Sequence, residues 1–206
     1  MERLILFSQP TEQNSEKLFA HLFPEEMKGV RFAYMPSNGR NSQHKYSDYW
    51  KTVAEARGFD FVFIDNTAEA EDALEEARKL DSANILLITG GNTFELLHNL
   101  RKSGLDQAIK NFRNKDQHVI AGFSAGAIVL SPRIDAASQP TGIDPTDLRD
   151  ENLVGISDLT GLGIVEFEIF PHYYEESDRA VLDNYQQQTS HEVKALGDDE
   201  LLILDK

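Results

Sequence analysis

Short apolar runs alternate with longer amphipathic stretches along residues 1–130, and this alternation predicts an α/β fold. The apolar runs are nearly continuous, as strands are in a parallel sheet whose two faces are both covered by helices. Several runs end in glycine- or proline-containing turns, where such strands stop. We therefore expect a doubly wound, mostly parallel sheet, with functional residues beyond the carboxyl ends of its strands.

The elements of this sheet follow from the hydrophobic pattern in chain order. The expected strands are the apolar runs at residues 4–7, 30–35, 59–64, 85–88 and 119–121. The expected helices are the amphipathic stretches at residues 11–22, 47–57, 67–80, 94–102 and 105–114. Gly58 is expected to cap the second helix. In the third helix, Leu74 belongs to the expected apolar face, and the acidic run from Glu69 to Glu76 is expected to face solvent.

The pattern changes after residue 130. Residues 131–159 are rich in Pro, Asp, Gly and Thr, which predicts a long surface excursion of the kind that is often functional. A strand is expected at 163–170, a helix at 178–188, and short strands at 193–196 and 201–204 joined by the turn 197–200. With no repeat or linker in the sequence, residues 1–206 are expected to form one domain.

Composition narrows the classes of function. The formal net charge is −15, from 20 basic and 35 acidic residues, and it repels phosphates, so we expect no nucleic-acid partner and no membrane binding. The chain has no cysteine, which excludes disulfides and thiolate nucleophiles. The first residues contain no signal-peptide apolar region, so a cytoplasmic location is expected. A homodimer is one of the oligomeric states that the sequence leaves open.

The most informative motif is Gly122-Phe123-Ser124-Ala125-Gly126, a G-x-S-x-G arrangement between an expected strand and an apolar helical stretch. Such a turn exposes a serine hydroxyl and aims backbone N–H groups at the group that the serine attacks. Ser124 is therefore the candidate nucleophile. The N–H of Ala125 is one expected oxyanion donor, and the Gly90-Gly91 turn after the fourth strand is the best source of the second.

A serine nucleophile needs a base and an orienting carboxylate. Of the 6 histidines, His172 is preferred because it follows a proline at the end of an expected strand. The motifs alone do not decide which carboxylate orients the histidine. After the histidine in the chain, the candidates are Asp198, Asp199 and Glu200; before it, they are Asp135, Asp144 and Asp158. The histidines are scattered, so no metal site is expected, and the Gly90-Gly91 turn lacks the spacing of a phosphate-binding loop, so no cofactor is expected.

Three segments together resemble peptidase family S51, which contains aspartyl dipeptidase (peptidase E) and cyanophycinase. They are Gly90-Gly91-Asn92-Thr93-Phe94, Gly122-Phe123-Ser124-Ala125-Gly126-Ala127 and Pro171-His172-Tyr173, and they occur in the family order. Met35-Pro36-Ser37 also looks like the family. The resemblance covers nearly the whole chain. It implies a flavodoxin-like fold related to class I glutamine amidotransferase domains, and a triad in the order Ser, His, acid.

By this resemblance, Ser124 is the nucleophile, His172 the base, and Gly91 and Ala125 the oxyanion donors. The family's acid lies in a late Leu-Pro-(Glu or Asp)-Gly-like turn. Leu196-Gly197-Asp198-Asp199 takes that place but departs from the pattern, so Asp198 is assigned with Asp199 as the alternative.

The resemblance implies a serine exopeptidase acting on small peptides, with dipeptides that begin with Asp among the expected substrates. Arg133, Arg149 and Arg179 are the cations that could pair with a substrate carboxylate, and Arg179 is preferred. Asn92 is also assigned to substrate binding. Two alternatives are an α/β-hydrolase-type esterase, whose acid precedes its histidine, and a non-catalytic binding member of the same fold.

Overall fold

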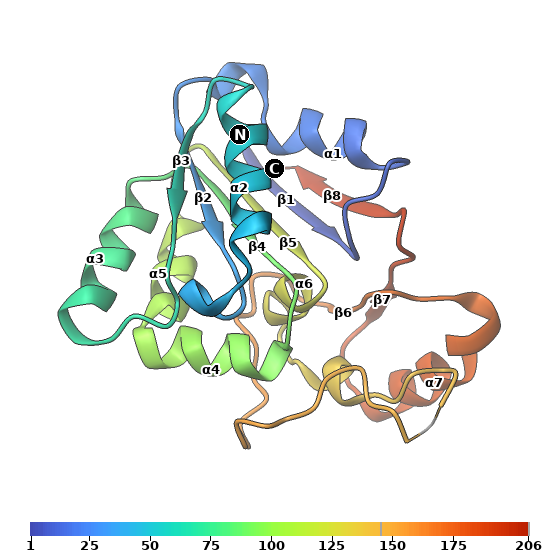
Figure 1. Ribbon diagram of the computed structural model, residues 1–206. Helices are drawn as coiled ribbons and strands as arrows, with labels where there is room; N and C mark the ends of the chain where they lie inside the picture. Colours follow the sequence, from blue (N-terminus) through green and yellow to red (C-terminus); the bar gives the residue numbers. More distant parts are fainter. Residues whose placement is uncertain (145, 206) are drawn as a thin grey trace.

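The computed structural model describes residues 1–144 and 146–205, and a six-stranded sheet lies at its centre (Figure 1). In the order β3-β2-β4-β5-β1-β8, its strands are Asp60–Phe63, Arg31–Met35, Ile85–Ile88, His118–Phe123, Glu2–Phe7 and Leu201–Asp205. The first five are parallel, and β8 pairs antiparallel with β1. Numbered along the chain, the five parallel strands lie in the order 3-2-4-5-1. The predicted fold class is confirmed.

Helices cover both faces of this sheet (Figure 1). The helices are α1 (Ser15–Leu22), α2 (His44–Glu55), α3 (Ala70–Asp81), α4 (Thr93–Ser103), α5 (Leu105–Phe112), α6 (Ala125–Val129) and α7 (Glu175–Gln188). Two apolar clusters separate the faces. Leu18 of α1 and Trp50 of α2 pack in one, and the apolar residues of α3 to α6 pack in the other. Alternate residues of β4 enter the two clusters, which is why its sequence is apolar throughout.

The segment after α6 differs most from its predicted form. The strand expected at 163–170 is a strand only at β6, Glu168–Phe170, which pairs in parallel with β7, Val193–Ala195, in a separate two-stranded sheet. The N–H groups of Leu162 and Ile164 instead donate to the carbonyls of Val129 and Leu130, at the end of α6. The turn 197–200 consequently joins two different sheets, because β7 belongs to the small sheet and β8 to the large one.

The acidic helix α3 does not present all of its acidic residues to solvent, as the sequence suggested. The side chain of Glu76 is buried, and it accepts a hydrogen bond from the N–H of Asp65 at 3.0 Å and pairs with Lys79 at 2.7 Å. Leu74, assigned to the apolar face, is 59% exposed. The loop after β3 needs an acceptor for its backbone, and Glu76 supplies it.

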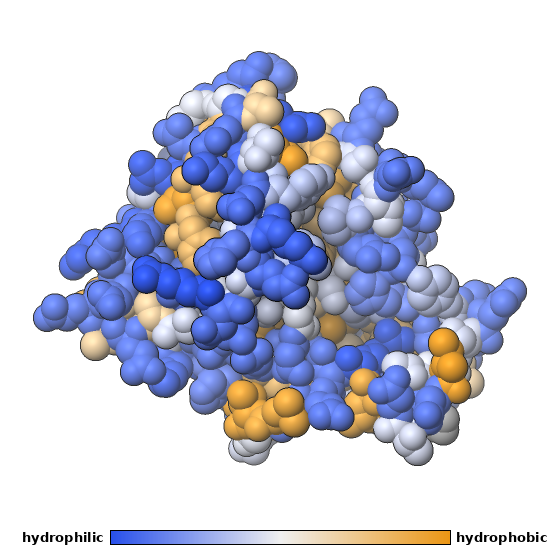
Figure 2. All heavy atoms as spheres, viewed as in Figure 1, coloured by the Kyte–Doolittle hydropathy of each residue, from blue (hydrophilic) through white to orange (hydrophobic). Residues whose placement is uncertain are grey.

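Residues 131–159 form the expected excursion over the surface. The face of the molecule in Figure 2 is mostly hydrophilic, with apolar side chains at its lower edge, over the segment between α6 and β6. The exposed apolar residues of that segment are Ile143, Leu148, Leu153 and Val154. Within residues 1–144 and 146–205, no helix is both long and apolar enough to span a bilayer.

Candidate active site

Ser124 follows β5 directly, at the carboxyl edge of the large sheet. Its φ of +51° and ψ of −119° are uncommon for a residue with a side chain. The neighbouring glycines allow this turn because the backbone passes so close to itself. A Cβ on Gly122 would lie 2.5 Å from the carbonyl oxygen of Gly126, and a Cβ on Gly126 would lie 2.1 Å from that of Ile88. Small residues in the motif are thus a steric requirement.

His172 lies across from Ser124, after the short strand β6. Its Nε2 is 3.0 Å from Oγ of Ser124, and its Nδ1 is 2.7 Å from Oδ1 of Asp198. The tautomer that satisfies both contacts carries its proton on Nδ1, which donates to Asp198, and leaves Nε2 to accept from the serine hydroxyl. The backbone N–H of His172 donates to Oγ of Ser8 at 2.9 Å, and Ser8 in turn donates to the carbonyl of Leu196 at 2.8 Å.

Asp198 lies in the turn between β7 and β8. Its Oδ2 accepts a hydrogen bond from the Tyr174 hydroxyl, and its backbone carbonyl accepts from Nδ2 of Asn14 at 3.2 Å. Partial burial raises the pKa of the Asp198 carboxyl. The hydrogen bonds from Tyr174 and His172 outweigh this effect and hold the pKa below its ordinary value. Asp198 is therefore ionised at neutral pH.

The other acidic candidates lie elsewhere. Asp199 accepts from Oγ1 of Thr11 at 2.6 Å. Asp135 pairs with Arg133 at 2.8 Å, Asp144 accepts from Thr146, and Asp158 pairs with Arg101 at 3.0 Å. Glu200 accepts from the N–H of Gly197 at 2.7 Å. Among the hydrogen bonds of the described residues, His172 thus meets Asp198, an acid that follows it in the chain, as the family order requires and the esterase order does not.

Backbone N–H groups flank Ser124 on two sides. Those of Ala125 and Gly126 lie in the first turn of α6, which offers them no intrahelical acceptor. On the other side, a Cβ on Gly90 would lie 3.1 Å from Cβ of Ser124, so the Gly90-Gly91 turn is in contact with the serine. Gly91 has φ +135°, and a Cβ there would lie 1.9 Å from Oγ of Ser37. Both expected oxyanion donors therefore lie on segments next to Ser124.

A model of peptidase family S51 matches residues 4–206 of this chain. The chain belongs to peptidase family S51. This finding confirms the resemblance that the three motifs indicated, and it makes the protein a serine-type peptidase, a hydrolase.

Relatives of this S51 peptidase agree with the family assignment. Peptidase E of Nostoc sp. is 27% identical over 194 residues, which cover 91% of this chain and 71% of that protein. An uncharacterized peptidase of Pasteurella multocida is 31% identical over 134 residues, which cover 60% of this chain and only 58% of the relative. The crystal structure of a peptidase E-like protein from Listeria monocytogenes superposes with a TM-score of 0.74 at 25% identity, covering 99% of this chain and 94% of that one.

The two residues assigned to substrate binding have partners of their own in this S51 peptidase. Oδ1 of Asn92 caps α4 by accepting from the N–H of Glu95 at 3.0 Å, and its Nδ2 donates to the carbonyl of Glu151 at 2.8 Å. The side chain of Arg179 is 63% exposed on α7, where it pairs with Glu175 and Asp183. Their assignment to substrate stays a prediction.

The sequence did not single out three polar residues for the places they take around Ser124, His172 and Asp198: Ser8, Tyr174 and Arg149. Ser8 follows β1, and because β1 lies beside β5 in the sheet, a polar residue at that position ends next to Ser124 and His172. Tyr174 comes two residues after His172 and reaches Asp198. Arg149, which the sequence suggested only as a cation for a substrate carboxylate, donates a hydrogen bond to the carbonyl of Pro171 at 2.8 Å. The strand order was the signal that could have identified Ser8.

Proposed function

We propose that this S51 peptidase is a serine exopeptidase that hydrolyses short peptides, including dipeptides with an N-terminal aspartate, through an acyl-enzyme on Ser124. One observation carries the proposal: an unbroken chain of hydrogen bonds runs from Tyr174 through Asp198 and His172 to Ser124. The base is then within hydrogen-bonding reach of both the nucleophile and the orienting carboxylate, as nucleophilic catalysis requires.

In the proposed reaction, Oγ of Ser124 attacks the peptide carbonyl while Nε2 of His172 takes its proton. The resulting oxyanion is stabilised by the N–H groups of Ala125 and Gly91. Asp198 stays ionised and stabilises the imidazolium. His172 then gives the proton to the leaving nitrogen, the C–N bond breaks, and the serine ester remains. Water, deprotonated by His172, hydrolyses the ester and frees the new carboxylic acid.

The preference for short peptides is supported by the excursion 131–159. It is tied to α4 on one side by Asp150, which accepts from Thr93 at 2.9 Å, and to the His172 segment on the other by Arg149. These two contacts hold the excursion beside the triad at residues 149–150, and a segment held there limits the room for a long chain. Burial raises the pKa of the Asp150 carboxyl because it disfavours the ionised form.

The preference for an N-terminal aspartate needs a cation that can meet its side chain. We assign Arg179 to this role, because its exposed guanidinium can exchange the neighbouring Glu175 for a substrate carboxylate. Asn92, at the start of α4, is the proposed neutral donor. Peptidase E proteins occur among the relatives of this chain, and that supports a peptidase E-like substrate.

The test compares hydrolysis of Asp-Leu and Ala-Leu by the wild-type protein, Ser124→Ala and Arg179→Ala. We expect Ser124→Ala to lose hydrolysis of any cleaved dipeptide, and Arg179→Ala to raise KM for Asp-Leu selectively. Arg113→Ala is the matched control, since Arg113 lies at the opposite edge of the sheet, before β5. Equal rates for wild type and Ser124→Ala would refute the nucleophile. Equal KM values for Asp-Leu in the two arginine variants would refute the role of Arg179.

A further inference from the structure

Two adjacent residues of the excursion, Arg149 and Asp150, contact opposite sides of the active site. Nη1 of Arg149 donates to the carbonyl of Pro171 at 2.8 Å, directly before His172. Oδ2 of Asp150 accepts from the N–H of Thr93 at 2.9 Å and from its hydroxyl at 2.5 Å. Thr93 begins α4, two residues after Gly91. The adjacent residues Arg149 and Asp150 thus link the segment that carries His172, the proposed base, to the segment that carries Gly91, a proposed oxyanion donor.

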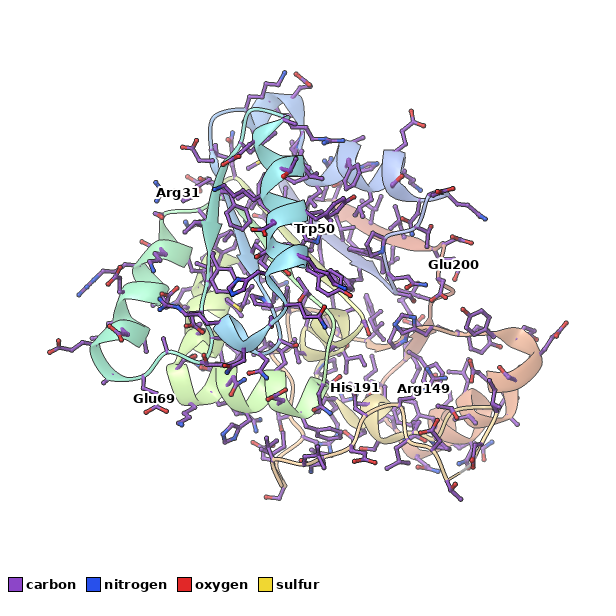
Figure 3. All side chains as sticks on the ribbon, viewed as in Figure 1. Arg31, Trp50, Glu69, Arg149, His191 and Glu200 are labelled. Atoms are coloured by element: carbon purple, nitrogen blue, oxygen red, sulfur yellow. The ribbon has the colours of Figure 1, made fainter. Side chains whose placement is uncertain are left out.

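Arg149 is unusually well enclosed for an arginine. Only 13% of its side chain is exposed, and its Nη2 is 2.9 Å from Oδ1 of Asp178, itself 5% exposed. The guanidinium carbon lies 4.0 Å from the centre of the Phe170 ring. Figure 3 labels Arg149 in the lower right part of the view, where α7 also lies. Removing either partner of such a buried pair leaves an uncompensated charge. The side chain of Arg149 is therefore fixed in place, and so is the Pro171 carbonyl to which it donates.

The Arg149–Asp178 ion pair contacts residues that precede and follow His172 in the chain. Asp178 accepts hydrogen bonds from the N–H of Tyr174 at 2.8 Å and from the N–H of Gly142 at 3.1 Å. Phe170, Pro171 and Tyr174, which surround His172 in sequence, are all contacted by Arg149 or Asp178. Tyr174 also reaches Asp198, so the same contacts bear on the acid.

His172 needs such support. Its φ is +54°, a conformation that a residue with a side chain keeps only where its surroundings impose it. The strand before it, β6, has only 3 residues. On the sheet side, Ser8 holds the His172 N–H. On the outer side, the contacts come from Arg149 and Asp178.

We propose that Arg149 and Asp150 form a strap that sets the position of His172 relative to the Gly90-Gly91 turn, with Arg149 as a positioning residue for catalysis. The inference rests on the proposed function of Ser124 and His172. It predicts that loss of Arg149 displaces the base while leaving the serine turn intact, because Ser124 is held by β5, β4 and α6.

Arg101 provides a matched control. It also ties the excursion to the body of the protein, through Nη1 to the carbonyl of Asp158 at 2.7 Å and Nη2 to the carbonyl of Thr160 at 2.7 Å. Arg101 belongs to α4, and none of these contacts involves residues 170–174. Arg101→Met therefore loosens the same excursion without releasing His172.

The experiment measures two properties of wild type, Arg149→Met, Arg149→Lys and Arg101→Met. The first is the rate at which a fluorophosphonate labels Ser124, and the second is the low-field proton NMR signal of His172 Nδ1–H, assigned with His172→Ala. We expect labelling of Arg149→Met to fall about 100-fold, as for a reacting group displaced by about 1 Å, and the proton signal to be lost. Both properties stay close to wild type in Arg101→Met.

Arg149→Lys keeps the charge, but an ammonium group cannot bind Pro171 and Asp178 together as the planar guanidinium does. We therefore expect the same loss of labelling rate and of the proton signal. This variant serves as the test if Arg149→Met fails to fold. Labelling and proton signals in both Arg149 variants equal to those of Arg101→Met would overturn the strap. A wild-type protein whose Ser124 is not labelled would instead overturn the proposed function, while the proton signal would still decide whether Arg149 positions His172.

Discussion

Ser124 and His172 both have positive φ angles, +51° and +54°, yet different surroundings hold them in place. Ser124 lies at the end of a strand in the middle of the large sheet, where backbone atoms of Gly126 and Ile88 leave no space for a Cβ on the nearby Gly122 and Gly126. His172 follows a strand of 3 residues at the periphery and donates hydrogen bonds to Ser8 and Asp198. The Arg149–Asp178 pair binds the backbone of Pro171 and Tyr174 on either side of it.

The two residues therefore depend on different forces. The position of Ser124 depends on close packing, which is formed whenever the sheet is formed. The position of His172 depends on a few directional polar contacts, each of which one substitution can remove. We expect changes around Ser124 to affect stability and activity together, and changes around His172 to affect activity more than stability.

The largest effect is expected from the polar contact closest to the chemistry. Asp198→Asn keeps the size of the side chain but removes the charge that fixes the imidazole tautomer, so kcat should fall about 10⁴-fold, the loss typical of this change in serine peptidases. Asp199→Asn, the matched control, loses only the contact with Thr11 and should keep near wild-type kcat. Steady-state hydrolysis and fluorophosphonate labelling measure both, and equal losses would show that the acid is misassigned.

The next prediction contrasts two glycines that are equally crowded. A Cβ added to Gly126 would lie 2.1 Å from the carbonyl oxygen of Ile88, and a Cβ added to Gly142 would lie 2.1 Å from the carbonyl oxygen of Ser177. Gly126→Ala should lower the free energy of unfolding by about 3 kcal/mol, since the sheet cannot move aside. Gly142→Ala should cost less, because the excursion can shift, but should still slow labelling of Ser124. Urea unfolding compares the two, and a larger stability loss in Gly142→Ala would contradict the contrast.

A smaller effect is expected from Ser8→Ala. This change removes the buried Ser8 hydroxyl, which accepts a hydrogen bond from the His172 N–H. It should lower the free energy of unfolding by about 1–3 kcal/mol. It should also lower the labelling rate of Ser124. Ser15→Ala removes an exposed hydroxyl bond at the start of α1 and is the control for a simple loss of a serine. Unchanged labelling in Ser8→Ala would mean that Asp198 and the strap are sufficient to hold His172.

The smallest effect concerns the pH dependence of Tyr174→Phe. The pKa of Asp198 is below its ordinary value in the folded protein, so its ionisation stabilises the fold above the unfolded pKa, and this contribution is lost as pH falls through the folded pKa. Loss of the Tyr174 hydroxyl raises the Asp198 pKa. The difference in Tm between wild type and Tyr174→Phe should then be largest near neutral pH and shrink toward acid. Tyr173→Phe, whose hydroxyl contacts Glu175 at the surface, is the control. A pH-independent Tm difference would contradict this role of Tyr174.

The sequence predicted the fold well where local pattern and burial agree. The strand Ile85–Ile88 has the predicted bounds because its residues are buried on both faces. The pattern failed at 163–167, where alternation resembled a strand but backbone groups bind the end of α6 instead. It also failed at Glu76, whose burial depends on a loop eleven residues earlier in the chain.

The site shows the same division. Ser124 could be predicted from a local motif, because the turn is built from adjacent residues. Of the residues around His172, Asp198 was assigned from the resemblance of its late turn to the family. Ser8 and Arg149 were not assigned to this role, because they come from distant parts of the chain and meet His172 and its neighbour Pro171 only in the folded structure. Their polar contacts leave no periodic pattern in the sequence.

The pairing of β8 with β1 has a consequence for the order in which the chain becomes active. Asp198 is carried by the turn that leads into β8, and β8 joins the sheet by pairing with the first strand of the chain. Ser8 follows β1 directly, at the end of that strand that pairs with the start of β8, and it hydrogen-bonds both His172 and Leu196. The proposed acid therefore reaches His172 only when β8 has paired with β1, so the first and last strands of the large sheet must both be in place before the proposed triad is complete.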